Sequence, residues 1–181
     1  MNFWKKIIAY LISLPARLKG VKFGQNSFIG PGYDLAPVLR GVVLGNNVLI
    51  GRHAWLDISR YTKGAEIIIG DGTNIGRYAM LSACKKISIG RKCLVSYNVS
   101  FLDHDHNFQA DVSPMDSNIT SGQEIIVGDG CFIGAHSFIL KGVKLGKYCV
   151  VGANSVVVNS FSDYSIIAGN PAKLIKKLTH L

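Results

Sequence analysis

The sequence repeats a large aliphatic side chain at intervals of six residues along most of its length. The residue after it is small or acidic, most often glycine. An amphipathic helix would place apolar residues three and four apart, and a half-buried strand would alternate them. A six-residue period indicates instead one short strand and one turn, repeated. Its clearest members are Leu44-Gly45, Ile50-Gly51, Ile69-Gly70, Ile75-Gly76, Ile89-Gly90, Val127-Gly128, Ile133-Gly134, Leu145-Gly146 and Val151-Gly152.

Three such hexads make one triangular coil of about eighteen residues, and stacked coils pair as parallel sheets on three faces. A single coil cannot bury its apolar face, so stacking supplies the stability. Glycine is expected after the aliphatic residue because the chain bends there and glycine tolerates the required dihedral angles. The repeat therefore predicts an all-β chain, a parallel β-helix solenoid.

The period is interrupted at residues 59–68, at Lys85-Lys86 and, for the longest stretch, at 102–126. Loops on a rigid solenoid are the usual places for binding and catalysis. The longest interruption opens with the run Asp103-His104-Asp105-His106, which makes it the candidate functional loop.

The two ends do not follow the repeat. Residues 1–20 predict an N-terminal amphipathic helix or cap, broken at Pro15. Residues 21–170 are the predicted solenoid domain, and residues 171–181 predict a short basic helix with Pro171 near its start. The apolar side of the first helix comprises Trp4, Ile7, Ile8, Leu11, Ile12 and Leu14.

Charge is concentrated at these ends. The formal net charge is +9, and the first acidic residue is Asp34. This balance favours an anionic partner such as a nucleotide-bearing cofactor or an acidic membrane surface. The helix at 1–20 is therefore expected to cover the open first coil or pack in an oligomer, to lie on an anionic membrane, or to do both. A basic and aromatic platform is absent from the sequence, so we expect no nucleic-acid partner.

The four cysteines form no CxxC pair and no zinc-finger spacing. Reduced, buried thiols are typical of a cytoplasmic protein. The apolar N-terminal stretch lacks a signal cleavage site and is too short to span a bilayer. We therefore expect a cytoplasmic protein, which would be peripheral at the inner membrane if residues 1–20 lie on lipid.

Two further motifs accompany the hexads, NVSFLDHDHNF at 98–108 and AGNPAK at 168–173. Together they resemble the hexapeptide-repeat acyltransferases, and within them the branch of sugar and polysaccharide O-acetyltransferases. The resemblance implies a left-handed β-helix, a homotrimer with active sites between subunits, and acetyl-CoA as the acyl donor. It also implies a glycan or sugar acceptor, in surface-polysaccharide or glycan biosynthesis.

Acetyl transfer to a hydroxyl needs a base, and histidine suits that role near neutral pH. In the resembled family the catalytic histidine lies eight residues after an asparagine of the preceding hexad, which from Asn98 points to His106. His104 competes for the role, and Asp103 or Asp105 is expected to orient the imidazole. A zinc site would need about three converging ligands. His136 is the only plausible third histidine, so we expect no metal.

The resemblance places the CoA arm against the small residues Ala135 and Ala153. Asn159 stands near a position where the family often carries Lys or Thr beside the nucleotide, and Lys173 is a further candidate for the nucleotide phosphates. For the acceptor we expect contacts from Ser82, Lys85 and Asn107, although the family's acceptor asparagine has no clear match.

Two other functions stay open on the sequence. One is N-acetyl transfer to an amino-sugar nucleotide, which needs the same histidine. The other is a metal-dependent or non-catalytic β-helix of the carbonic-anhydrase kind, which needs three histidines to converge.

Overall fold

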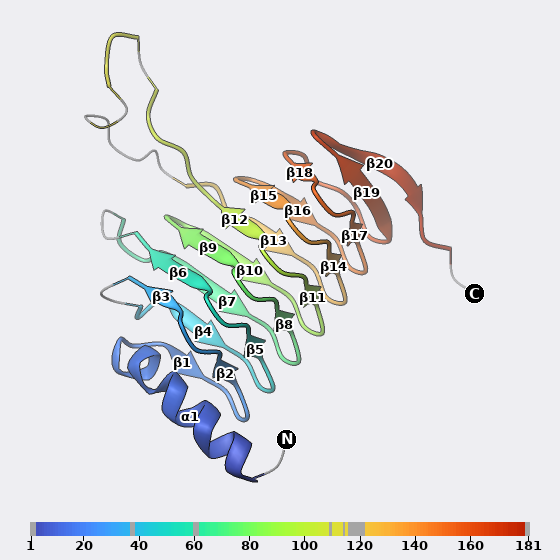
Figure 1. The fold of residues 1–181 in the computed structure, drawn as a ribbon. Coiled ribbons are helices and arrows are strands. Elements are labelled where there is room, and N and C mark those ends of the chain that lie inside the picture. The colour runs from blue at the N-terminus through green and yellow to red at the C-terminus, as the bar shows by residue number, and fades with distance from the viewer. Residues whose placement is uncertain are drawn as a thin grey trace.

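A computed structural model describes residues 3–36, 39–59, 62–108, 110–113, 115 and 122–179. Helix α1 (Phe3–Leu18) precedes the strands, which form three sheets in parallel coils (Figure 1). The first sheet contains, in spatial order, β1 (Lys22–Phe23), β4 (Val42–Leu44), β7 (Glu66–Ile69), β10 (Lys86–Ile89), β13 (Ile125–Val127) and β16 (Lys144–Leu145).

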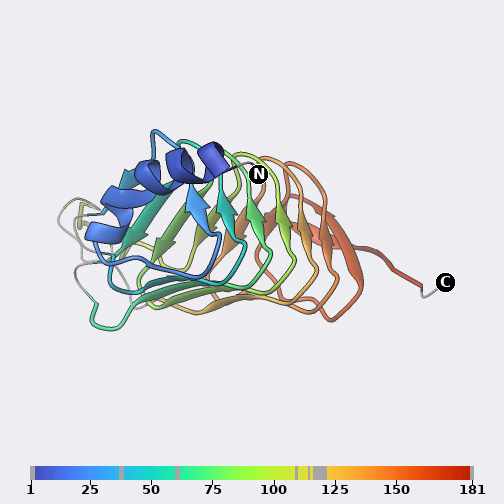
Figure 2. The same ribbon diagram turned by 90° about the horizontal axis from the view of Figure 1, so that it is seen from below.

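The other two sheets complete each coil. The second contains β2 (Phe28–Ile29), β5 (Leu49–Ile50), β8 (Asn74–Ile75), β11 (Leu94–Val95), β14 (Phe132–Ile133), β17 (Val150–Val151), β19 (Ser165–Gly169) and β20 (Ala172–Lys177). The third contains β3 (Asp34–Leu35), β6 (Trp55–Ile58), β9 (Met80–Ala83), β12 (Ser100–Leu102), β15 (Phe138–Leu140) and β18 (Val156–Val157). Consecutive coils stack along one axis (Figure 2), which confirms the predicted parallel β-helix.

The aliphatic residues that define the period are the core. In the second sheet, each pairs with the equivalent residue of the next coil, so they form one continuous inward ladder. Its members are all buried: Ile50, Ile75, Val95, Ile133, Val151 and Ile167. Each coil therefore buries its apolar side chains against the coils on either side, as the solenoid argument requires.

Glycine is needed after the aliphatic residue for a different reason from the expected bend in the chain. At Gly76 an added Cβ would lie 2.4 Å from the backbone carbonyl of Ser96 in the next coil. The left-handed backbone conformation falls instead two residues later, at Tyr78, with φ 59°. Glycine is thus required at this position by the close approach of stacked coils, and the turn itself is made by a residue with a side chain.

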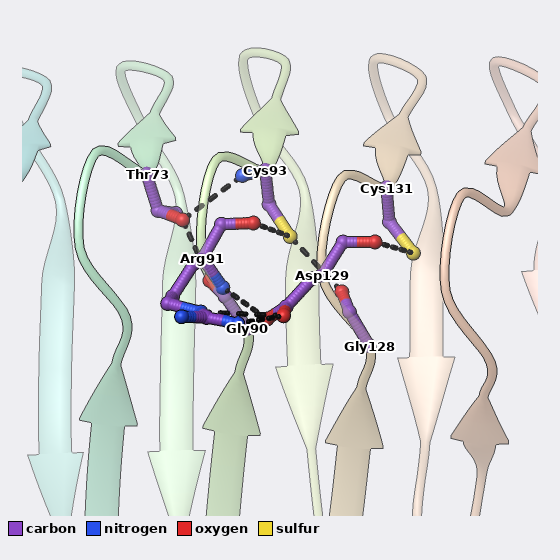
Figure 3. Close-up of polar contacts among 7 residues, drawn as sticks. All are labelled: Thr73, Gly90, Arg91, Cys93, Gly128, Asp129 and Cys131. Atoms are coloured by element: carbon purple, nitrogen blue, oxygen red, sulfur yellow. Dashed lines mark hydrogen bonds and ion pairs between the residues drawn. The ribbon is translucent and has the colours of Figure 1, made fainter.

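A second inward ladder consists of small polar residues at the turns between the first and second sheets (Figure 3). The Thr73 hydroxyl donates to the Gly90 carbonyl at 2.6 Å, and the Cys93 thiol donates to the Gly128 carbonyl at 3.1 Å. Cys131 repeats this contact with the next coil. The side chains of this ladder thus satisfy turn carbonyls that stacking removes from water. All four cysteines of the chain are free and buried.

The first helix lies across the open end of the solenoid, beside β2 (Figures 1 and 2). The Ser13 hydroxyl accepts the Ile29 amide at 2.9 Å, and Tyr33 donates to the Ile12 carbonyl at 2.6 Å. The expected break at Pro15 is wrong, because α1 continues to Leu18. An interior proline removes one hydrogen bond from a helix without always ending it.

The C-terminal helix predicted for residues 171–181 is also wrong. The chain reverses at Asn170 and Pro171, directly after Gly169 with its φ of 107°, and β20 pairs antiparallel with β19. Without β20, the last coil would leave one edge of the second sheet unpaired. An isolated helix of this length is marginal in water, whereas pairing satisfies backbone groups on both strands.

Within the part of the chain that the structure describes, no helix has the length and hydropathy needed to cross a bilayer.

Candidate active site

The candidate functional loop leaves the solenoid after β12 (Figure 1), and its first residue is fully buried. The Asp103 carboxylate accepts the backbone amides of Cys84, Lys85 and Lys86, each at 2.7 Å. It also contacts His104 Nδ1 at 3.0 Å. The two-residue interruption at Lys85-Lys86 therefore has a structural role, because it turns three amides toward one carboxylate.

Two opposing effects act on the pKa of Asp103. Burial raises it, whereas the hydrogen bonds from His104 and the three backbone amides lower it by more. The net pKa lies below the usual range of an aspartate, so the carboxylate is ionised at neutral pH. An ionised carboxylate only accepts hydrogen bonds, and His104 Nδ1 must therefore carry the hydrogen of this contact.

The two histidines of the loop lie in different surroundings. The His104 side chain is 12% exposed and is held by Asp103. His106 is exposed. Of the two aspartates expected to orient an imidazole, Asp103 contacts His104, whereas Asp105 forms an ion pair with Lys141.

The residues expected to bind the acceptor lie near this loop but differ in availability. Ser82 is buried in β9, and its hydroxyl donates to the Asp57 carboxylate at 3.0 Å. Lys85 is exposed beside Asp103, and Asn107 is partly exposed. We call this edge, with turns at residues 84–85, 103–108 and 141–142, the loop corner.

Ala135 and Ala153 lie at another corner, formed by the turns 97–98, 135–136 and 153–154 between the second and third sheets. The Asn154 amide donates to the Ala135 carbonyl at 2.9 Å, so the two alanines occupy equivalent places on successive coils. We call this edge the alanine corner. The strand β15 runs from the alanine corner to the loop corner. Within one chain, the expected base and the expected CoA contacts therefore lie at opposite ends of the strands of the third sheet.

Two contacts at the alanine corner were not foreseen. Asn98 Nδ2 lies 2.8 Å from His136 Nδ1, and the Tyr97 ring meets the His136 ring edge-on at 4.9 Å. Left-handed φ values at Asn98 and His136 stack their side chains on neighbouring coils. The sequence signal was the shared place of these residues in the hexad.

The two remaining candidates for CoA contacts lie near the C-terminal end of the solenoid. Asn159 is exposed in the turn after β18, and Lys173 is exposed in β20. Lys177, which was not singled out in that role, donates to the Ser162 hydroxyl at 2.7 Å and so fixes β20 to the last coil.

One cluster of three potential metal donors occurs among the described residues, namely Cys84, Asp103 and His104. The Asp103 carboxylate in it already accepts three amides and contacts the imidazole. His136, the third histidine that a zinc site would need, lies at the alanine corner instead. A metal at the cluster would therefore have to displace hydrogen bonds that the fold already makes.

The three stacked parallel sheets define a β-helix protein, and comparison with known proteins identifies its family. Residues 124–158 match the family model described as the hexapeptide repeat of succinyl-transferase. WbbJ of Escherichia coli (strain K12), assigned as an O-acetyl transferase of lipopolysaccharide biosynthesis, is 31% identical over 167 residues, covering 88% of this chain and 73% of WbbJ. The chain belongs to the hexapeptide-repeat acyltransferases.

Solved structures agree on the fold. AntD, an N-acyltransferase from Bacillus cereus in complex with dTDP and 3-hydroxybutyryl-CoA, superposes with a TM-score of 0.76 at 22% identity, covering 92% of this chain and 88% of AntD. A hexapeptide-repeat acetyltransferase from Vibrio cholerae, complexed with acetyl-CoA, gives 0.67 at 21% identity, covering 94% and 88%. The chain thus has the left-handed β-helix fold of these acyltransferases.

Proposed function

We propose that this protein transfers the acetyl group of acetyl-CoA to a hydroxyl of a sugar, in surface-polysaccharide or glycan biosynthesis. The observation that carries the proposal is the buried Asp103 carboxylate against His104 Nδ1 at 3.0 Å. This contact lies at the start of the loop that forms the longest interruption of the solenoid, and loops of this kind are where an acceptor can approach.

The chemistry follows from the tautomer. With its hydrogen on Nδ1, His104 offers Nε2 as a proton acceptor. Nε2 takes the hydroxyl proton as the oxygen attacks the thioester carbonyl and forms a tetrahedral intermediate. The intermediate collapses by breaking the carbon–sulfur bond, and the imidazolium returns its proton to the departing CoA thiolate. Asp103 acts by holding the ring and stabilising its charged form.

Two histidines compete for the role of base in this proposal. The spacing from Asn98 favours His106, whereas the contact with Asp103 supports His104. We propose His104, because an exposed imidazole without a fixed tautomer is less well prepared to accept a proton.

We also propose that the active unit is a homotrimer. The loop corner and the alanine corner lie at opposite ends of the strands of the third sheet. One chain alone therefore does not bring the proposed base beside the proposed CoA contacts. A neighbouring copy that places its alanine corner beside the loop corner would complete the site. The CoA used at one copy's loop corner would then contact residues of the neighbouring copy, namely Ala135, Ala153, Asn159 and Lys173.

The acceptor is proposed from relatives. WbbJ supports a hydroxyl acceptor on a glycan, whereas AntD supports the alternative of an amine on a sugar nucleotide. Both chemistries use the same base and donor. Treatment of the product with alkaline hydroxylamine separates them, because it cleaves an O-acetyl ester and leaves an amide intact. A cytoplasmic location is part of the proposal, since acetyl-CoA is a cytoplasmic metabolite.

The test is thiol release from acetyl-CoA with a panel of glycans and sugar nucleotides. We expect His104→Ala to lower kcat about 100- to 10,000-fold, with His106→Ala having a much smaller effect. The reverse order would assign the base to His106. Full activity in both variants would overturn general-base catalysis by this loop, and loss of folding is checked by circular dichroism of each variant.

A further inference from the structure

The outward side of α1 is an apolar surface that the fold does not use. Along one face of the helix, large side chains are exposed to solvent by a third or more, and the two at its ends, Trp4 and Leu18, are 70% and 81% exposed. We call this surface the outer face of α1. Its members are Trp4, Ile7, Ile8, Leu11, Leu14 and Leu18.

The solenoid is contacted by a different face made of smaller residues. Ser13 and Ala16 are fully buried, and Ala9 and Ile12 are partly buried. A helix that only covered the first coil would turn its largest apolar residues toward that coil. Here the residues are arranged in the opposite way, so covering the coil does not account for the outer face.

Basic residues lie near both ends of α1: Lys5 and Lys6 in its first turns, Arg17 in its last turn, and Lys19 and Lys22 just after it. Arg17 lies over the Tyr10 and Phe23 rings and Lys19 donates to the Leu35 carbonyl, so the positive charge is held close to the helix. The nearest acidic residue along the chain is Asp34. A second copy of the same helix would bring like charges together, whereas a surface of anionic groups above an apolar layer complements both features.

We propose that the outer face of α1 binds in the plane of a membrane surface that carries anionic lipid headgroups. The helix is 16 residues long, too short to span a bilayer and long enough to lie in its interface. The solenoid then projects away from the membrane, because α1 covers its end (Figure 2). This inference does not depend on the identity of the acceptor or of the base.

The chain provides its own reporter, because it contains only two tryptophans, Trp4 and Trp55. In the Trp55→Phe variant of the full-length protein, Trp4 alone emits. We expect its emission to shift to shorter wavelength with vesicles of phosphatidylcholine and phosphatidylglycerol, and brominated lipids to quench it. Vesicles of phosphatidylcholine alone should give a weaker response, and about 0.5 M salt should reduce the response to the anionic vesicles.

Cosedimentation with the same vesicles tests the face itself. We expect Leu11→Ser, at a side chain 58% exposed, to weaken partitioning about tenfold. Ile175→Ser is the matched control, because Ile175 is 62% exposed among lysines at the opposite end of the solenoid. It should leave vesicle binding unchanged.

Three outcomes would overturn the proposal. One is equal binding of wild type and Leu11→Ser, and a second is loss of binding in Ile175→Ser alone, which would move the lipid contact to the C-terminal end. The third is a change of molecular mass in solution for Leu11→Ser without any vesicle binding by the wild type. That result would show that the outer face covers another copy of the chain.

Discussion

At the scale of single residues, Asp103 connects the solenoid to the long insertion. Its carboxylate is held by three amides of the preceding coil, and its own carbonyl accepts the Gln123 amide at 2.7 Å. One side chain and one peptide group thus anchor both ends of the long insertion. The sequence identified Asp103 as an orienting residue, but it did not indicate which imidazole it would hold.

Asp103→Asn should destabilise the protein by about 1–3 kcal/mol at pH 7, because a neutral amide replaces an ionised acceptor at three amides. The folded-state pKa of Asp103 is lowered, so its contribution is fully present above the unfolded value of about 4 and is lost as the pH falls through the folded value. Urea unfolding of both proteins from pH 7 to pH 2 checks this.

The difference between the two proteins should shrink at the acidic end. A gap of constant size across that pH range would mean that the charge of Asp103 does not stabilise the fold. The variant should also lower kcat while CoA binding is retained, because a side-chain amide cannot hold the imidazole in the same way.

At the scale of elements, the C-terminal strand β20 closes the edge that β19 would otherwise leave open. Lys177 donates to the Ser162 hydroxyl and to the Asp163 carbonyl, so the tail is attached to the last coil by its side chain as well as its backbone. An uncovered parallel edge is a template for pairing with other chains.

Removing residues 172–181 should therefore lower the thermal unfolding midpoint and promote self-association, whereas removing residues 179–181 should do neither. Differential scanning calorimetry and light scattering measure the two effects. Equal behaviour of both truncations would show that β20 contributes nothing to the solenoid end.

At the scale of the whole molecule, stacking determines which groups are accessible. Four thiols lie inside the coil, and burial raises the pKa of the Cys84 thiol. Hydrogen bonds with Cys131 instead lower the pKa of the Cys93 and Cys149 thiols. Burial, which keeps a reagent away from the sulfur, is therefore what protects all four thiols. This matters for the enzyme assay as well, because the reagent that detects released CoA also reacts with accessible cysteines.

We expect the folded protein to react with an aromatic disulfide reagent far more slowly than glutathione does, and all four thiols to react at once in denaturant. The time course of absorbance by the released aromatic thiolate reports both. A rapid phase of one thiol in the native protein would mean that one coil opens locally.

Much of the fold could be predicted because the six-residue period assigns each aliphatic residue to the interior without reference to the rest of the chain. Any coil built on this period places Ile75 and Ile133 on its inner side, and both side chains are buried. The sequence by itself therefore determined the solenoid, its interruptions and the loop that carries His104 and His106.

Only the tertiary structure decided three other features. It placed Asp103 against His104, because the amides that hold the carboxylate come from another coil. It made the tail a strand, because backbone pairing with the open edge of β19 stabilises the segment more than a short isolated helix would. It also turned the large side chains of α1 outward, since periodicity shows that a helix has two faces, while only packing decides which of them meets the protein.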